Sequence, residues 1–172
     1  MEGSWTLLPE PGSLAVGPSL NDHSWWSVSA AQIEERGCQF DDVYKFNPGT
    51  FNEADNTWTG QYELILDGST WLEGWQATTQ GCGAPVAPHD ASNAPFTYTV
   101  DLINETVTLT GIGAYMGLPK VYNGGELSAT NKEYPESIKY QYVDIEGESD
   151  DHIATFQVNT SGATWQFKFV KK

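Results

Sequence analysis

Three segments near the C-terminus decide the fold: 137–145 (SIKYQYVDI), 153–158 (IATFQV) and 164–170 (TWQFKFV). Within them, side chains of contrasting polarity alternate, which is the pattern of β-strands with one buried face. The stretch 159–162 (NTSG) between the last two is a turn signal. Consecutive strands joined by turns predict an antiparallel sheet.

The same pattern occurs upstream of these segments. Residues 42–46 (DVYKF) end at an Asn-Pro-Gly turn signal, and 61–66 (QYELIL) end at an Asp-Gly pair. Residues 96–101 (FTYTVD) and 106–110 (TVTLT) flank a short connection and predict a hairpin. This regular spacing predicts an all-β fold, an antiparallel β-sandwich of the jelly-roll type, with a lipocalin-like barrel as the alternative.

The rest of the chain predicts little helix. Residues 30–36 (AAQIEER) favour one short helix, with Ser29 as its N-cap and Gly37 as its stop. The length of 172 residues favours one domain, which we place at 4–172, with residues 1–3 as an added start. The chain has no apolar run long enough to span a membrane and no signal-peptide pattern at its start. We therefore expect either a cytosolic protein or an excised piece of a larger one.

Charge excludes several classes of ligand. The chain has 8 basic and 23 acidic residues, a formal net charge of −15. Nucleic-acid binding needs clustered cations, which this chain lacks, and anionic membranes and acidic glycans are repelled. Aromatic residues make up 13% of the chain, although charged residues are only 18%. So many aromatic rings indicate either a β-rich core or an aromatic ligand-binding surface.

The two cysteines, Cys38 and Cys82, leave two alternatives open. A disulfide would close a long loop and stabilise the fold by about 4 kcal/mol, whereas two free buried thiols are equally compatible with the spacing. The absence of a Cys-x-x-Cys pair gives no support to thiol-redox chemistry or a zinc site. A long loop at 78–95 contains Cys82, which would pin it.

The most informative motif is 71–76 (WLEGWQ). In an extended chain Trp71, Glu73 and Trp75 would project from one face, about 6.6 Å apart. Two indoles beside a carboxylate suit a sugar, because the rings cover its C–H faces and the carboxylate accepts from its hydroxyls. Gln76 is a further hydroxyl partner. The alternative is one core tryptophan and a solvated Glu73.

Two further segments contribute candidate binding residues. In 24–27 (SWWS) an extended chain places Trp25 and Trp26 on opposite sides, so at most one lies in the core, and an exposed loop tryptophan indicates binding. The segment 111–120 contains Gly-x-Gly but opens no helix, so it is not a phosphate loop. Its Tyr115 and Lys120 are candidates to line a site.

Several acidic residues are further candidates for a binding, metal or catalytic site. His89 and Asp90 are neighbours in the long loop and form either a buried hydrogen-bonded pair or a sugar contact. The pair 41–42 (DD) is a candidate for structural Ca²⁺, and no other metal or cofactor is expected.

The run 146–151 (EGESDD) superficially resembles a hydrolase motif but favours a solvated turn. A glycosidase needs two carboxylates about 5–9.5 Å apart, and Glu73 with Asp90 is the only pair that we nominate.

Several longer segments together resemble a known type of module. They are 24–27 (SWWS), 38–47 (CQFDDVYKFN), 71–76 (WLEGWQ), 82–90 (CGAPVAPHD), 113–120 (GAYMGLPK) and 165–171 (WQFKFVK), preceded by Trp5-x-Leu and Gly17-Pro18. In this order they resemble carbohydrate-binding modules of multimodular secreted or surface-anchored proteins of marine Bacteroidota. Some of those proteins belong to laminarin-utilisation systems.

The resemblance implies a non-catalytic, monomeric module that binds a neutral polysaccharide or oligosaccharide, laminarin (β-1,3-glucan) first. It also implies a Cys38–Cys82 disulfide and an extracellular or cell-surface location within a larger protein. Gln166 stands where these modules usually carry Arg. The expected ligand-binding set is Trp25, Trp26, Trp71, Glu73, Trp75, Gln76, His89, Asp90, Tyr115 and Lys120.

Two other classes of function remain open. The first is a glycoside hydrolase or lyase, which requires a carboxylate pair in the aromatic cleft. The second is a lipocalin-like barrel that holds an apolar ligand in an interior cavity lined by aromatic rings. Complete burial of Trp71 and Trp75 in a closed barrel would favour this second alternative over the sugar-binding platform.

Overall fold

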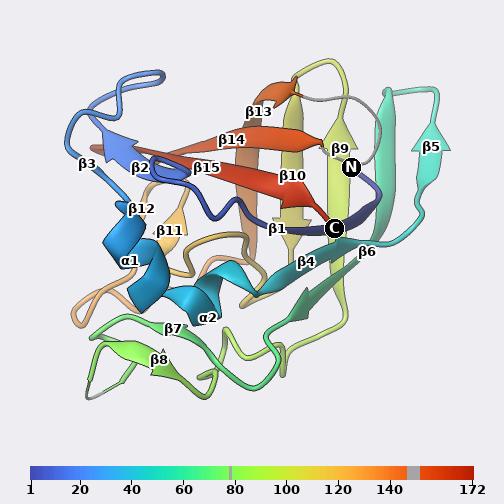
Figure 1. Cartoon of the computed structure of the whole chain (residues 1–172). Helices are drawn as coiled ribbons and strands as arrows, with labels where there is room; N and C mark the ends of the chain where they lie inside the picture. The colour runs from blue at the N-terminus through green and yellow to red at the C-terminus, as the bar shows by residue number, and fades with distance from the viewer. Residues whose placement is uncertain (78, 147–151) are drawn as a thin grey trace.

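Eight antiparallel strands form a closed barrel in the computed structural model, which describes residues 1–77, 79–146 and 152–172 (Figure 1). In order around the barrel they are β1 (Gly3–Leu7), β4 (Val43–Phe46), β6 (Thr57–Ile65), β9 (Phe96–Asp101), β10 (Thr106–Thr110), β13 (Ser137–Glu146), β14 (Ile153–Asn159) and β15 (Thr164–Lys171). Each strand pairs with the next barrel strand along the chain, and β1 also pairs with β15.

The all-β antiparallel prediction is confirmed, but the architecture is the barrel of the alternative and not the sandwich. Closure is visible at Trp5, which pairs with Tyr44 on one side and with Lys171 on the other. Alternating polarity defines one buried face for each strand. Alternation does not distinguish one closed sheet from two packed sheets. For this reason the sandwich was favoured over the barrel.

The remaining elements lie outside the barrel wall. They are β2 (Leu14–Gly17), β3 (Trp26–Ser27), α1 (Ala30–Glu35), α2 (Gly37–Phe40), β5 (Thr50–Asn52), β7 (Thr70–Leu72), β8 (Gly81–Gly83), β11 (Val121–Tyr122) and β12 (Gly125–Glu126). Strands β2 and β3 continue the sheet from β15, and β5 pairs with β6. No described helix is long and apolar enough to cross a membrane.

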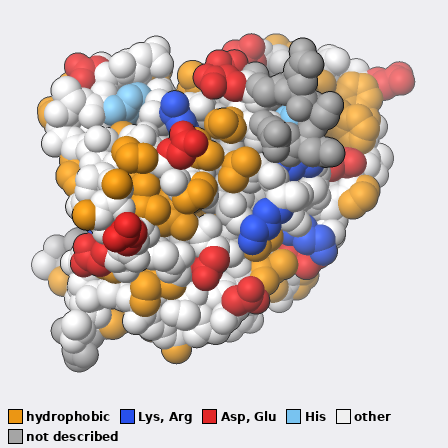
Figure 2. All heavy atoms as spheres, viewed as in Figure 1, with side chains coloured by type: hydrophobic (Ala, Val, Ile, Leu, Met, Phe, Trp, Pro, Cys, Tyr) orange, Lys and Arg blue, Asp and Glu red, His pale blue; other side chains and the backbone are white. Residues whose placement is uncertain are grey.

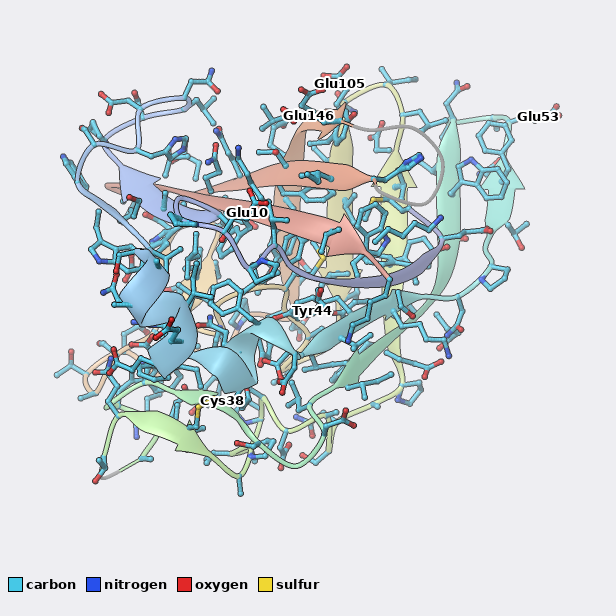
Figure 3. The ribbon with its side chains drawn as sticks, viewed as in Figure 1. Glu10, Cys38, Tyr44, Glu53, Glu105 and Glu146 are labelled. Carbon is cyan, nitrogen blue, oxygen red and sulfur yellow. A yellow bond between two sulfur atoms is a disulfide. The ribbon has the colours of Figure 1, made fainter. Side chains whose placement is uncertain are left out.

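The barrel has two different ends. One, here called the helix end, carries α1, α2, the β7–β8 ribbon and the β11–β12 ribbon (Figure 1). The other, the turn end, carries the β9–β10 turn and the β5–β6 hairpin. Figure 3 shows Cys38 at the helix end, with Glu105 and Glu146 at the turn end.

Aromatic rings fill the barrel between these ends. Phe46 lies 5.3 Å from Tyr62 and 5.1 Å from Tyr98, and Tyr44 lies 5.3 Å from Phe169, between ring centroids. All five side chains are at most 2% exposed. Burial of each large apolar side chain stabilises the fold by about 1.5–3 kcal/mol. The barrel interior is therefore a packed core.

Local predictions of the turns and caps are largely confirmed. Helix α1 begins with a capping box, in which Ser29 Oγ accepts from the Gln32 backbone N–H and Gln32 Oε1 accepts from the Ser29 backbone N–H. The hairpin is present, with Asp101 paired to Thr106. Gly37, however, does not stop the helical structure, because it begins α2.

The disulfide between Cys38 and Cys82 is formed, with the two Cα atoms 5.9 Å apart. It joins α2 to β8 and resolves the choice between paired and free thiols. The extended conformation considered for 71–76, by contrast, ends at Leu72. There the chain turns, as the Gln76 backbone N–H donates to the Glu73 carbonyl at 2.9 Å. The tryptophans and the glutamate of this motif therefore do not share one strand face.

Candidate functional site

A cleft of about 320 Å³ opens at the helix end. Its lining comes from separate parts of the chain: Val16 of β2, Trp26 of β3, Arg36 after α1, Glu73 after β7, Leu118 and Lys120 before β11, and Trp165 of β15. Strand pairing explains part of this assembly. Trp165 lies opposite Val16, and Val16 lies opposite Trp26, so these three residues form one row across β15, β2 and β3.

Two indoles form the floor of the cleft. The ring centroids of Trp26 and Trp165 are 6.3 Å apart, and their planes are tilted by 57°. Trp165 is buried, whereas Trp26 is half-buried. The indole N–H of Trp165 donates to Glu126 Oε1 at 2.6 Å, which fixes the orientation of the ring. The more accessible Trp26 is therefore the better placed ring for contact with a ligand.

Lys120 forms one side of the rim. Its Nζ lies 3.0 Å from Glu126 Oε2 and 4.7 Å from the centroid of the Trp165 ring. The Glu126 carboxylate thus binds the indole N–H and the ammonium at the same time. A partly exposed ion pair of this kind contributes at most about 1 kcal/mol, so its main effect is to hold the ammonium in place.

Arg36 is the second cation that lines the cleft. Its guanidinium carbon lies 4.3 Å from the centroid of the Trp71 ring and 5.7 Å from that of Trp26. Burial lowers the pKa of Arg36, and the nearby carboxylate of Glu73 opposes that shift. Gln39 links this residue to the core, because it accepts from Arg36 Nη1 at 3.5 Å and donates to the Gly117 carbonyl at 2.9 Å.

The cleft brings together some of the residues predicted from the sequence. Trp26, Glu73 and Lys120 line it. Trp25 is adjacent and 58% exposed, and its backbone N–H donates to the Val16 carbonyl. Trp71 is only 4% exposed, with Arg36 over one face of its ring, so it offers no open ring face to a ligand.

Three predicted residues lie instead in an aromatic cluster. The His89 ring is 5.6 Å from Tyr115, 6.0 Å from Trp75 and 5.7 Å from Tyr134, each time edge to face. His89 and Tyr115 are buried, and Trp75 is half-buried. Burial lowers the pKa of His89 to about 4, so the ring is neutral at pH 7. In this structure the cluster packs the long loop against the barrel.

The last two predicted residues hold turns. Gln76 Oε1 accepts from the Glu73 backbone N–H at 3.1 Å. Asp90 Oδ1 accepts from the backbone N–H and the hydroxyl of Ser92, and these hydrogen bonds lower the pKa of Asp90. Of the nominated carboxylate pair, only Glu73 lines the cleft. The acidic run at 146–151 lies outside the described residues except for Glu146, which is exposed at the end of β13.

The two aspartates considered for Ca²⁺ have different environments. Asp41 is exposed, whereas Asp42 is 1% exposed and accepts a 2.7 Å hydrogen bond from the Thr70 hydroxyl. Burial raises the pKa of Asp42 to about 8, so the neutral acid predominates at pH 7. Within the described ranges, no group of three or more His, Cys, Asp or Glu side chains is placed to hold a metal ion.

Sequence reasoning missed Trp165 and Arg36, which line the cleft, and Glu126, which binds two of the lining residues. Trp165 belongs to a quoted motif, but its alternation with Phe167 and Phe169 indicated only a core position. The one local signal for Arg36 was its position directly before Gly37 and the disulfide-bonded Cys38. For Glu126 the sequence offers none, because its role depends on contacts with Trp165 and Lys120, which are distant in the chain.

No protein-family model matches this chain, and no curated protein or solved structure matches it either.

Proposed function

We propose that this chain is a non-catalytic module that binds a neutral β-glucan, laminarin first, in the cleft at the helix end. One observation carries the proposal. Trp26, Glu73, Lys120 and Trp165, which line one cleft, come from four of the segments that resemble carbohydrate-binding modules. Segments far apart in the sequence thus supply one site, as expected if the shared motifs serve a common ligand.

The chemistry of the lining suits a sugar. A pyranose presents apolar C–H groups on its faces and hydroxyls around its edge, and the half-buried Trp26 ring can cover such a face. The Glu73 carboxylate accepts from hydroxyls, while Arg36 and Lys120 donate to them. The volume of about 320 Å³ is at the lower end for ligand pockets, which suits a short stretch of a chain. Several modules in one protein would then raise the affinity.

Electrostatics favours a neutral glycan over an acidic one. The Lys120 ammonium is paired with Glu126, and Glu73 lies in the field of Arg36, so both rim cations already have carboxylates nearby. Figure 2 shows acidic side chains at many places on the visible face and basic side chains at few. The net charge of −15 would repel a uronate or sulfate.

The lipocalin-like alternative shares the barrel, and the burial of Trp71 was one of its expectations. Trp71 belongs to the β7–β8 ribbon, however, and lies under Arg36 rather than inside the barrel. Because packed aromatic rings fill the barrel interior, the external cleft is the stronger candidate for the ligand site. A hydrolase would need a pair of carboxylates at the site, whereas Asp90, the nominated partner of Glu73, does not line the cleft, and sugar release tests this alternative directly.

An affinity gel tests the proposal, with laminarin, mixed-linkage glucan, xylan, alginate and no glycan in parallel lanes. We expect laminarin to retard the protein, and Trp26→Ala to abolish the retardation. Trp58→Ala is the matched control, because Trp58 is 37% exposed and lies at the turn end. Circular dichroism checks that each variant folds. Lack of retardation in every glycan would overturn the proposal, and reducing-sugar release would identify an enzyme.

A further inference from the structure

The turn end carries a concentration of exposed apolar side chains. Five of the large apolar side chains exposed in the described residues belong to its strands and turns: Phe51 (37%), Trp58 (37%), Leu102 (52%), Ile103 (67%) and Val143 (41%). The rings of Phe51 and Trp58 pack on each other at 5.3 Å. Isolated exposed apolar residues are ordinary, but a group at one end of a barrel indicates a contact surface.

Two adjoining hollows lie beneath this surface. One has a volume of about 430 Å³ and the other about 280 Å³, and Met1, Val100 and Leu102 line both. Trp58 lines the first hollow, and it is paired with Val100 across β6 and β9. Tyr98, a ring of the packed core, also lines the first hollow. Ligands therefore have room in the mouth of the barrel but not in its interior.

Two ammonium groups border the larger hollow, those of Lys171 and of the Met1 amino terminus, and they are close enough to interact electrostatically. No described residue forms an ion pair with Lys171. Its side chain crosses Gly3, where an added Cβ would lie 2.9 Å from Lys171 Cε, so the glycine leaves space for the lysine stem. The carboxylate of Glu2, in the same hollow, accepts from the Gly49 backbone N–H at 3.0 Å. Asp101 and Glu105 line the smaller hollow, where the Asp101 carboxylate accepts from Ile103 and Asn104, so an anionic group is better placed in the larger one.

We propose that the turn end binds a small amphipathic molecule with an apolar body and one carboxylate, such as a medium-chain fatty acid. The body fills the hollows around Val100 and Leu102, and the carboxylate pairs with Lys171. This direct ion pair outweighs the repulsion from the acidic residues elsewhere on the surface, because salt screens charges that are more than about 8–10 Å apart. This site is independent of the glucan cleft and lies at the opposite end of the barrel. Affinity rises about fourfold for each added methylene until the hollows are full, as apolar burial predicts.

Calorimetric titration of the intact chain tests this site, with hexanoate, decanoate and decanol as probes. We expect decanoate to bind saturably at one site, with lower affinity for hexanoate and for decanol. Lys171→Gln lowers the affinity for decanoate about tenfold and leaves decanol unchanged, because only the carboxylate uses the ammonium. Trp26→Ala binds decanoate as the unmodified chain does, which separates this site from the cleft.

Leu102→Asp places a charge among the lining residues of both hollows and abolishes decanoate binding. Leu20→Asp is its matched control, since Leu20 is 51% exposed, lines neither hollow and changes the net charge equally. Absence of saturable decanoate binding would overturn the inference. Equal losses in the two aspartate variants would overturn it too, because they would indicate unspecific adsorption. Neither result bears on laminarin retardation, which tests the cleft alone.

Discussion

The guanidinium carbon of Arg36 lies 4.3 Å from the centroid of the Trp71 ring and covers its face. The indole is 4% exposed, although its motif suggested an open stacking surface. Because Arg36 also contacts Trp26 and Gln39, it joins the wall of the cleft to the core. A residue between two short helices thus connects the stability of the fold to the shape of the site.

Replacement of Arg36 tests this connection. Arg36→Ala should lower the free energy of unfolding by about 1–2 kcal/mol, because it removes a cation–π contact and the packing of the side-chain stem. Urea denaturation measures the change, with Lys132→Ala as a control at an exposed position. Arg36→Lys keeps the charge but not the planar group and should recover only part of the loss. Full stability of Arg36→Lys would contradict the stacking role.

The disulfide should dominate the stability of the helix end. Cys38→Ala combined with Cys82→Ala should lower the free energy of unfolding by about 4 kcal/mol, since the bond closes a loop between residues 44 apart. Thermal and urea unfolding measure the loss. Reductant should shift the unmodified chain by a similar amount and leave the double variant unchanged. A shift of the double variant in reductant would mean that the effect has another origin.

The buried acid Asp42 should make stability depend on alkaline pH. Its pKa of about 8 in the folded chain exceeds the usual value of 3.8, so its folded state prefers the proton. The resulting stabilisation is complete below pH 3.8 and is lost as the pH rises through about 8, by at most about 6 kcal/mol. Asp42→Asn, which cannot ionise, should be markedly more stable than the unmodified chain at pH 8.

Unfolding of both proteins in urea at pH 4 and pH 8 measures this difference. Near pH 4 the two should be similar, since the asparagine can still accept from Thr70. Asp41→Asn, at the exposed neighbouring position, retains Asp42 and should lose stability between pH 4 and pH 8 as the unmodified chain does. An Asp42→Asn variant with the same advantage at both values would show that ionisation is not the cause.

His89 should make stability depend on acidic pH, so that the chain loses stability as the pH falls. Its pKa is lowered from 6.5 to about 4 by burial, so the unfolded chain takes up the proton first. Stability is therefore retained above pH 6.5 and falls by about 3 kcal/mol as the pH drops toward 4. His89→Phe keeps the edge-to-face packing and should be less sensitive to acid between pH 7 and 4. His152→Phe, at a half-buried position outside the cluster, should behave as the unmodified chain.

Patterns between near neighbours in the chain were sufficient for the local structure. The hairpin at 96–110, the capping box at Ser29 and the strands at 137–145 and 164–170 all follow from alternation and turn chemistry. The site was only partly predictable. Trp26, Glu73 and Lys120 line the cleft, but Trp75, His89 and Tyr115 pack together elsewhere, because an aromatic residue in a loop has the same sequence signal in either role.

The sequence by itself determined the all-β antiparallel class, the short helix and the negative charge, because these depend on composition and on period-two patterns. The tertiary structure alone decided barrel over sandwich, since closure depends on β1 pairing with both β4 and β15. It also decided which tryptophans are accessible. Arg36 and Trp165 reach the cleft, and Glu126 reaches Trp165, only through strand pairing and packing between distant segments, which no local pattern records.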